Sequence, residues 1–420
     1  MKIFVFGSGG REHALCRALK NSDLNNIKIY CYPSNAGIEP LTEKNMFNSY
    51  DDAINFIIKE KIDLVVIGPE NYLAEGIVDF LTNYNIRVFG PKKDVAKLES
   101  SKLFAKKFME KYNIPTASYK LFDNERDIKS NIKAPIVLKY DGLAAGKGVA
   151  VCKNEKDIND FCDLVYNKKS FGDNNIVIAE ELLEGKELSV IIAVSNHDYL
   201  VFPYARDHKR AFDNNEGPNT GGMGTIASFD LIDDETKKEI DEKIIKRTLK
   251  GFEKENIEYR GFLFIGLILT KKGSFVLEYN VRFGDPEAQS ILNLLEGDFA
   301  RFIYKTFDNN FDKNIINFKK NYSISIIAAS KGYPGKYEKD KKIYGLNEFG
   351  QNDQLLNDNI YIYHSGTIKK NNDFYTNGGR VFSLSSYGND LEMLRKKIIN
   401  GFDKVYFDGM FFRKDIGNYL

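Results

Sequence analysis

Cysteine is scarce in this sequence, and so are long apolar runs. The four cysteines (Cys16, Cys31, Cys152 and Cys162) are widely spaced and form no C-x-x-C pair. A disulfide framework or a zinc site is therefore not expected, and a reducing compartment fits. No apolar stretch reaches membrane-spanning length, and no signal-like segment precedes the first strand-like run. We expect a cytoplasmic protein.

An excess of charge of one sign is missing too. Sixty Lys and Arg side chains nearly cancel 59 Asp and Glu, which leaves a net charge of +1. A chain with this balance has no overall positive potential that would attract nucleic acid or an anionic membrane. Any anion must therefore be bound by local groups. We expect small-molecule substrates, neither nucleic acid nor membrane as a partner, and a monomer or weak homodimer.

The composition and length are those of a multidomain globular chain. Hydrophobic residues make up 43% of 420 residues, which is too long a chain for one compact core. In the first hundred residues, short β-branched or aromatic runs alternate with helical patterns, which predicts a parallel, doubly wound sheet. The loops at the carboxyl ends of its strands should share one ligand crevice. The predicted strands are 3–6, 27–31, 64–67 and 87–89.

The pattern changes after a single helix predicted at about 93–112. Residues 118–202 give short strands around one helix, an α+β pattern, and a Gly/Pro/Asn-rich loop follows at 214–224. A long polar helix (233–255) then precedes two apolar strands, 261–269 and 274–279. A final α/β segment begins at residue 322.

The first motif, Gly7-Ser8-Gly9-Gly10, follows a strand and opens a helix. Its amides and the helix N-terminus could hold a phosphate. Dinucleotide binding fits poorly, because the third glycine of G-x-G-x-x-G would fall on Glu12. A phosphate or phosphosugar ligand fits better, and a purely structural turn remains the alternative.

The second motif is a glycine-rich hairpin tip. Lys139 to Gly148 reads KYDGLAAGKG between two strand-like runs, and Gly148 stands where a Walker A loop has a Mg²⁺-binding hydroxyl residue. A glycine-rich hairpin can fold over a triphosphate, because its amides approach closely, and Lys139 and Lys147 add charge. The alternative is a flexible hairpin with solvated lysines.

A third signal follows the strand 176–179, which runs into Glu180 and Glu181. Backbone groups there could meet an adenine edge, and carboxylates beyond could take ribose hydroxyls, although exposed acidic loops are common.

The fourth motif is the strand that carries Glu278, Asn280 and Arg282. Alternate residues of a strand share a face, so these three polar side chains should point the same way. A carboxylate and an amide oxygen suit a hard cation such as Mg²⁺. Arg282 could neutralise an acyl phosphate or a substrate carboxylate. A half-exposed edge strand is the plainer alternative.

A charged run at 206–210 stands close to the glycine-dense loop 217–224. Anion contact and ordinary solvated surface are both open there.

These motifs, in this order, resemble the phosphoribosylamine–glycine ligase family of ATP-grasp enzymes, nearly end to end. The resemblance implies an α/β and α+β multidomain fold. It comprises a Rossmann-like N-terminal domain (1–100), an ATP-grasp domain (101–320) with a small mobile lid at about 118–190, and a C-terminal α/β domain (321–420). The sequence departs from the family's usual residues at Tyr140 and Arg206, and the strand 262–269 carries no acid.

The resemblance also implies site residues. ATP would be bound by residues of the hairpin and the acidic segment: Lys102, Lys139, Gly142, Gly146, Lys147, Gly148, Glu180, Glu181, Leu183 and Glu187. Mg²⁺ or Mn²⁺ would be bound by Glu278 and Asn280. The other substrates would be contacted by residues of the crevice and the glycine-dense loop: Gly9, Gly10, Asn35, Glu70, Thr220, Gly221 and Gly222. Catalysis would depend on Arg282, Asp207 and Lys209.

The implied reaction joins glycine to 5-phosphoribosylamine through glycyl phosphate, with ATP converted to ADP and phosphate. Phosphoryl transfer of this kind needs positioning and charge neutralisation more than a covalent nucleophile. Another ATP-grasp carboxylate–amine ligase, and a catalytically silent nucleotide-binding regulator, are the alternatives.

Overall fold

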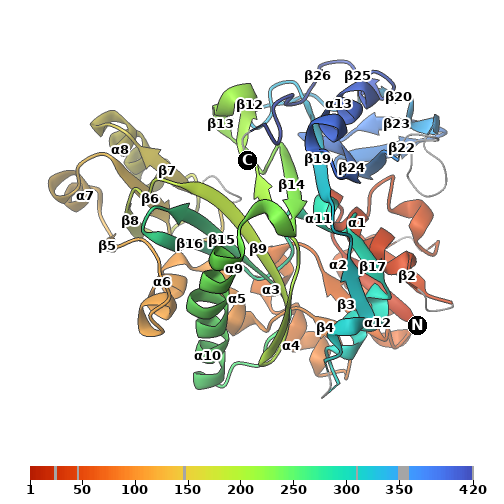
Figure 1. The fold of residues 1–420 in the computed structure, drawn as a ribbon, viewed down its shortest axis with the longest axis horizontal. Coiled ribbons are helices and arrows are strands. Elements are labelled where there is room, and N and C mark those ends of the chain that lie inside the picture. The colour runs from red at the N-terminus through yellow and green to blue at the C-terminus, as the bar shows by residue number, and fades with distance from the viewer. Residues whose placement is uncertain (23–25, 45–46, 145–147, 309–310, 349–358, 419–420) are drawn as a thin grey trace.

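The computed structural model describes residues 1–420 except 23–25, 45–46, 145–147, 309–310, 349–358 and 419–420. The chain begins with a parallel four-stranded sheet in the order β2-β1-β3-β4, as predicted (Figure 1). Every residue of β3 is buried, as expected for a strand covered on both faces. The elements are β1 (Lys2–Phe6), α1 (Gly10–Lys20), β2 (Lys28–Tyr32), α2 (Tyr50–Lys59), β3 (Leu64–Ile67), α3 (Glu70–Glu75), α4 (Ile77–Thr82) and β4 (Val88–Phe89).

The single helix predicted at about 93–112 is two helices. α5 (Lys93–Ser100) ends before Ser101, which has extended backbone angles (φ −132°, ψ 110°), and α6 (Lys102–Lys111) begins after it. The Ser101 hydroxyl accepts a hydrogen bond from the Phe104 amide, 3.0 Å away, and so caps α6. The apolar periodicity continues across the break, which is why the sequence pattern predicted one helix.

A small antiparallel sheet in the order β5-β8-β6-β7 occupies the range in which the lid is predicted, and we use the name lid for it below. It projects at the left of Figure 1. It has its own hydrophobic cluster, in which Leu138, Tyr140 and Phe161 are buried. The elements are β5 (Tyr119–Phe122), α7 (Glu125–Asn131), β6 (Ile136–Tyr140), β7 (Val149–Cys152), α8 (Glu155–Cys162), a π-helical turn (Asp163–Asn167) and β8 (Val177–Glu181).

A large antiparallel sheet in the order β16-β15-β9-β11-β14-β19-β24-β21 forms the rest of the core. β14 pairs with β19 from Gly224↔Ile326 to Ala227↔Ser323, so this sheet runs without interruption from the central segment into the C-terminal one. Its strands are β9 (Lys186–Ser195), β11 (Tyr204–Asp207), β14 (Gly224–Ser228), β15 (Arg260–Thr270), β16 (Gly273–Asn280), β19 (Tyr322–Ser330), β21 (Tyr361–His364) and β24 (Arg380–Gly388), with β10 (Asp198–Val201) on β9 and β26 (Met410–Phe411) on β19.

The structure differs from the prediction at two places close to the candidate site. β16 ends at Asn280, so Arg282 lies just beyond the strand. The glycine-dense loop contains a short strand, β13 (Glu216–Asn219), which pairs with β12 (Arg210–Phe212). The remaining helices are α9 (Asp234–Ile240), α10 (Lys246–Lys254), α11 (Glu287–Ile291), α12 (Phe299–Lys305) and α13 (Leu391–Gly401). The remaining strands are β17 (Leu295–Gly297), β18 (Ile316–Phe318), β20 (Lys342–Tyr344), β22 (Thr367–Lys370), β23 (Asp373–Thr376) and β25 (Tyr406–Phe407).

The N-terminal and C-terminal segments lie side by side. The His364 amide at the end of β21 donates a hydrogen bond to Nδ1 of His13 on α1, 2.8 Å away. Within the described ranges, no helix combines the length and apolarity that crossing a membrane requires.

Candidate active site

One lysine of the lid hairpin and one at the start of α6 face the large sheet. Lys139, at the end of β6, is buried, and its Nζ lies 3.0 Å from the Leu277 carbonyl oxygen on β16. Nζ of Lys102, the first residue of α6, donates to the Gly142 carbonyl oxygen at 2.9 Å. Burial lowers the pKa of Lys102, while the carboxylate of Glu278 opposes this effect. Both ammonium groups therefore face the strand that carries Glu278.

The unusual Tyr140 forms part of the hairpin base. Its buried ring packs against Phe171, with centroids 5.5 Å apart, and a Cβ built on Gly142 would lie 2.7 Å from the ring. The Tyr140 amide donates to the Gly148 carbonyl oxygen at 2.8 Å, which closes the hairpin. The predicted ligands Gly146 and Lys147 lie outside the described residues.

Glu180 is held between two lysines. Its carboxylate lies 2.9 Å from Lys139 Nζ and 3.2 Å from Nζ of Lys106. Lys106 also donates to the Thr116 hydroxyl and the Ala117 carbonyl oxygen. Burial lowers the pKa of Lys106 to about 8, against the opposing charge of Glu180. Lys106 was not predicted from the sequence, although it follows Lys102 by one helical turn.

The other residues of the acidic segment are more open. Glu181 is exposed, and its side chain accepts a hydrogen bond from the Ser118 amide. Leu183 is half-buried. Glu187, at the start of β9, is exposed and lies 3.2 Å from Lys209 Nζ. Within the described ranges, Glu180 is the acidic residue of this segment that contacts Lys139.

Glu278 and Asn280 are the candidate metal ligands on β16. Burial opposes ionisation, but Lys209, Lys139 and Lys102 lower the pKa of Glu278, so its carboxylate stays charged. Gly266 on β15 stands opposite Glu278, and no second acid comes from that strand. Among the described residues, no group of three or more His, Cys, Asp and Glu side chains is placed to hold an ion. Two protein oxygens completed by water and phosphate oxygens fit Mg²⁺.

Arg282 follows these ligands and is surrounded by carboxylates. Its Nη2 lies 2.9 Å from Glu99 and 3.3 Å from the Asn280 amide oxygen, and its Nε lies 3.4 Å from Glu70. Burial opposes the charge, but Glu99 and Glu70 raise the pKa of Arg282. The charges of Arg282 and Arg11 lower the pKa of Glu70 despite its burial. Glu99 was not predicted from the sequence.

A pair of carboxylates lies at the end of β11. Burial raises the pKa of Asp207 well above its usual range, and the charge of Glu287 on α11 adds to this effect. Glu287 accepts a hydrogen bond from the Ser189 hydroxyl at 3.0 Å. Asp207 Oδ1 is buried and has no hydrogen-bond partner in the described part of the chain. A cation would relieve both the unmet acceptor and the like-charge repulsion.

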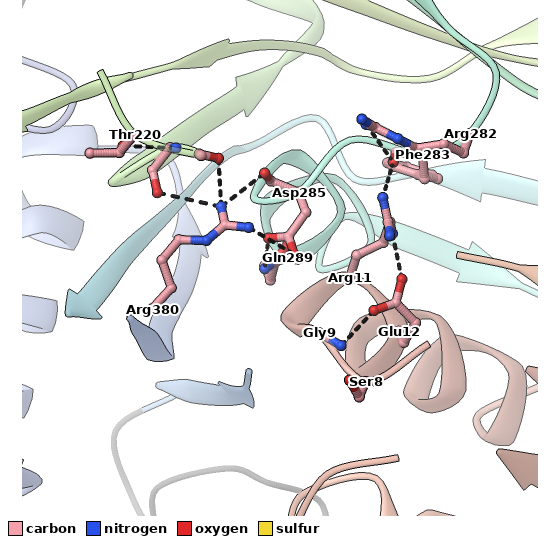
Figure 2. A network of polar contacts seen from close by, with 12 residues as sticks. Ser8, Gly9, Arg11, Glu12, Thr220, Arg282, Phe283, Asp285, Gln289 and Arg380 are labelled. Atoms are coloured by element: carbon pink, nitrogen blue, oxygen red, sulfur yellow. Dashed lines mark hydrogen bonds and ion pairs between the residues drawn. The ribbon is translucent and has the colours of Figure 1, made fainter. Parts of the chain in front are cut away.

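The glycine-dense loop is fastened by a residue of the C-terminal segment, as Figure 2 shows. Nη1 of Arg380 donates to the carbonyl oxygens of Gly221 (2.6 Å) and Asp285 (3.0 Å), and its Nη2 lies 3.2 Å from the Asp285 carboxylate. The Thr220 hydroxyl accepts from the Gly222 amide and donates to the Lys209 carbonyl oxygen. Arg380 was not assigned a role from the sequence.

The N-terminal loop is engaged by its own helix. The Gly9 amide donates to the Glu12 carboxylate at 2.6 Å, and Arg11 joins that carboxylate to the Phe283 carbonyl oxygen (Figure 2). The Gly9 amide is thus not free to hold a phosphate as the motif suggested. A Cβ on Gly10 would lie 2.3 Å from the amide nitrogen of Gln289, so a larger residue there would have to displace that side chain.

Asn35 is likewise occupied by internal hydrogen bonds. Its Nδ2 donates to the Ser8 and His364 carbonyl oxygens, and its Oδ1 accepts from the Gly37 and Ile38 amides. Asn35 therefore shapes the loop.

A cleft of about 680 Å³ opens between Glu70 and Asn71 on one side and lid residues that include Leu143 and Phe171 on the other.

This arrangement defines the class of protein. In the ATP-grasp arrangement, an antiparallel lid that carries a lysine faces a strand whose side-chain oxygens can bind a metal ion. A solved complex of biotin carboxylase from Campylobacter jejuni with β,γ-ATP shares the fold at a TM-score of 0.70 and 15% identity, covering 99% of this chain and 93% of that one.

The chain belongs to the phosphoribosylglycinamide synthetase family. The family's N domain matches residues 1–99, its ATP-grasp (A) domain residues 100–288 and its C domain residues 323–419. It is 42% identical to phosphoribosylamine–glycine ligase of Caldanaerobacter subterraneus subsp. tengcongensis and 39% identical to that of Clostridium acetobutylicum, with 99% of each chain covered. The crystal structure of phosphoribosylamine–glycine ligase from Thermotoga maritima matches with a TM-score of 0.83 and 33% identity, over 99% of this chain and all of that one (100%).

Proposed function

We propose that the chain ligates glycine to 5-phosphoribosylamine at the expense of ATP, giving glycinamide ribonucleotide, ADP and phosphate in purine biosynthesis. The observation that carries this proposal is the cluster around the end of β16. There Lys102, Lys139 and Lys209 lower the pKa of Glu278, in a chain matched over its whole length by ligases of this name.

ATP and a divalent metal are used throughout the ATP-grasp class. We assign the phosphates to Lys102, Lys139 and the glycine hairpin, and the ion, Mg²⁺ or Mn²⁺, to Glu278 and Asn280. When bound, the ion would neutralise charge on the transferred phosphoryl group. The Glu180 carboxylate is already paired with two lysines, so we assign the adenine to the backbone groups that follow this residue and not to its side chain.

Glycine would be activated as glycyl phosphate. A carboxylate is a poor electrophile, and phosphorylation supplies its leaving group. Arg282 neutralises the acyl phosphate, and the pair of Asp207 and Glu287 offers carboxylate oxygens to the glycine ammonium. Lys209 stands close enough to contribute charge. Closure of the lid, proposed to span about residues 118–190, excludes the water that hydrolyses such an intermediate.

Phosphoribosylamine would occupy the crevice between the N-terminal loops and the glycine-dense loop. Because the Gly9 amide and the Asn35 side chain are engaged internally, these residues would shape the crevice, as would Gly10. Glu70 and the loop Thr220–Gly222 face it from either side. We further propose a cytoplasmic monomer or weak homodimer with domains at 1–100, 101–320 and 321–420.

One assay tests the function against its alternatives. ADP release is measured with glycine, with phosphoribosylamine and with both. Release that requires both supports the proposal. Release with a different acid or amine identifies another ATP-grasp ligase, and ATP binding without turnover identifies a silent regulator; either result overturns the proposal.

A further inference from the structure

Glu99 is a buried acid near the end of α5, just before α6 begins. It is the penultimate residue of α5, and its carboxylate reaches across to the segment that follows β16. One oxygen accepts a hydrogen bond from the Val281 amide at 2.8 Å, and the other lies 2.9 Å from Nη2 of Arg282. Glu99 thus holds both the backbone and the guanidinium just beyond the candidate metal ligands.

Arg282 needs such a partner. A guanidinium on a long, flexible side chain loses rotamer freedom when a site holds it in one place. Its other contacts are longer: 3.3 Å to the Asn280 amide oxygen, 3.3 Å from Nη1 to the Phe283 carbonyl oxygen and 3.4 Å to Glu70. Nε has no hydrogen bond to any described residue. Glu99 therefore makes the shortest contact that fixes the guanidinium.

Burial of the Glu99 carboxylate is costly. Burial raises its pKa to about 7, against the opposing charge of Arg282, and Glu70 adds to the rise. Buried ion pairs are weak contributors to stability, because desolvation costs about as much as the attraction returns. Stability alone therefore gives little reason for a carboxylate at this position, whereas orientation of Arg282 gives a direct one.

The residues that follow Glu99 hold the lid. The Ser101 hydroxyl donates to Asp141 at 3.0 Å, and the Leu103 amide donates to the same carboxylate at 3.1 Å. Lys102 reaches the Gly142 carbonyl oxygen. One short segment, 99–103, thus contacts both the arginine side of the site and the base of the hairpin.

We propose that Glu99 is a positioning residue that sets Arg282 for the phosphoryl- and acyl-transfer steps. This rests on the proposed function. Glu99 touches no reacting atom and acts only through the guanidinium and the Val281 amide.

A double-mutant cycle tests the proposal. Glu99→Gln keeps the shape and an acceptor for the Val281 amide but removes the charge that holds Arg282. We expect kcat to fall about 10- to 100-fold, as for a small misplacement of a positioned group, with the KM for ATP changed less than about twofold. With Arg282→Lys already present, adding Glu99→Gln should lower kcat by less than about twofold.

Controls keep the outcome decisive. Glu239→Gln removes a carboxylate that accepts from Ser274, at the opposite end of β16, and should leave kcat at the wild-type value. Glu99→Asp, which keeps the charge on a shorter side chain, should recover part of the rate, and it replaces Glu99→Gln in the cycle if that variant does not fold. Multiplicative effects in the cycle, or a wild-type kcat for Glu99→Gln, would overturn the proposal. Wild-type protein that releases no ADP with both substrates would instead refute the proposed function.

Discussion

At the scale of residues, the site concentrates charge that the whole chain does not have. Three lysines surround Glu278, and two carboxylates surround Arg282, within a molecule whose net charge is +1. Despite burial, the lysines lower the pKa of Glu278 and the carboxylates raise the pKa of Arg282, so these two groups stay ionised. Anions are therefore attracted to this cluster and not to the surface at large.

Removal of the candidate metal carboxylate tests this cluster directly. We expect Glu278→Ala to lower kcat at ordinary Mg²⁺ by about 10³-fold or more, because charge neutralisation by a bound ion is worth several kcal/mol. The fold should persist, since Glu278 is only half-buried. ADP release and circular dichroism measure the two effects. Glu239→Ala on α9, whose carboxylate accepts from Ser274 at the far end of β16, serves as the control. Full activity of Glu278→Ala would remove the metal assignment.

His208 predicts how stability depends on acid. Burial lowers its pKa to about 4, and Arg413 and Arg206 add to this effect while Asp415 opposes it. Its Nε2 accepts from the Gly417 amide at 3.3 Å. The unfolded chain gains this proton near pH 6.5 but the folded chain only near pH 4, so stability is lost as the pH falls through that window.

The expected loss is on the order of 3 kcal/mol across the whole window. Urea unfolding at pH 7.5 and pH 5 should show about 2 kcal/mol of this loss, and His208→Gln should remove most of that difference. His197→Gln, at an exposed position, should keep the wild-type slope. If His208→Gln loses as much unfolding free energy between pH 7.5 and pH 5 as the wild type, other groups cause the acid sensitivity.

At the scale of elements, the glycine-dense loop depends on one backbone conformation. Gly222 has φ +108°, and a Cβ there would lie 2.4 Å from Pro286 and 2.6 Å from Asp207 Oδ1. We expect Gly222→Ala to displace Asp207 and lower kcat about 10- to 100-fold. The matched control is Gly409→Ala, where φ is +76° and the nearest atom is 3.3 Å away. It should cost about 1 kcal/mol of stability and leave kcat unchanged.

Most helices and strands were predicted from local patterns in the sequence. The N-terminal strands are runs of β-branched and aromatic residues that the sheet buries, so their positions followed from composition. The break at Ser101 was missed, because serine is tolerated in a helical run and its capping role depends on the turn it adopts.

Some residues of the candidate site could be predicted from local motifs, and others could not. Lys139, Glu278 and Asn280 stand in short motifs whose spacing is informative. Glu99 and Arg380 act through contacts with partners 182 and 159 residues away, and no local pattern encodes such pairs. The internal hydrogen bonds of Gly9 and Asn35 could not be predicted either, since a motif does not show which amides form hydrogen bonds within the folded protein.

At the scale of the whole molecule, Arg380 joins the C-terminal segment to the centre of the site. Lysine cannot reproduce the fork that contacts the Gly221 carbonyl oxygen together with the carbonyl oxygen and one carboxylate oxygen of Asp285. We expect Arg380→Lys to lower kcat about 10-fold, while the rise in melting temperature on adding Mg²⁺–ATP stays as in the wild type.

Arg395→Lys on α13, in the same segment, is the matched control and should keep the wild-type rate. Loss of the thermal shift in Arg380→Lys would show that this arginine acts on the nucleotide and not on the glycine-dense loop.

The pairing of β14 with β19 has a consequence for anyone who divides the gene. A fragment that stops at residue 320 leaves the backbone of β14 bare along Gly224–Ala227, and uncovered strand edges recruit other chains. Such a fragment should sediment as aggregate when produced alone, and should return to the supernatant when the remainder of the polypeptide is supplied in the same cell.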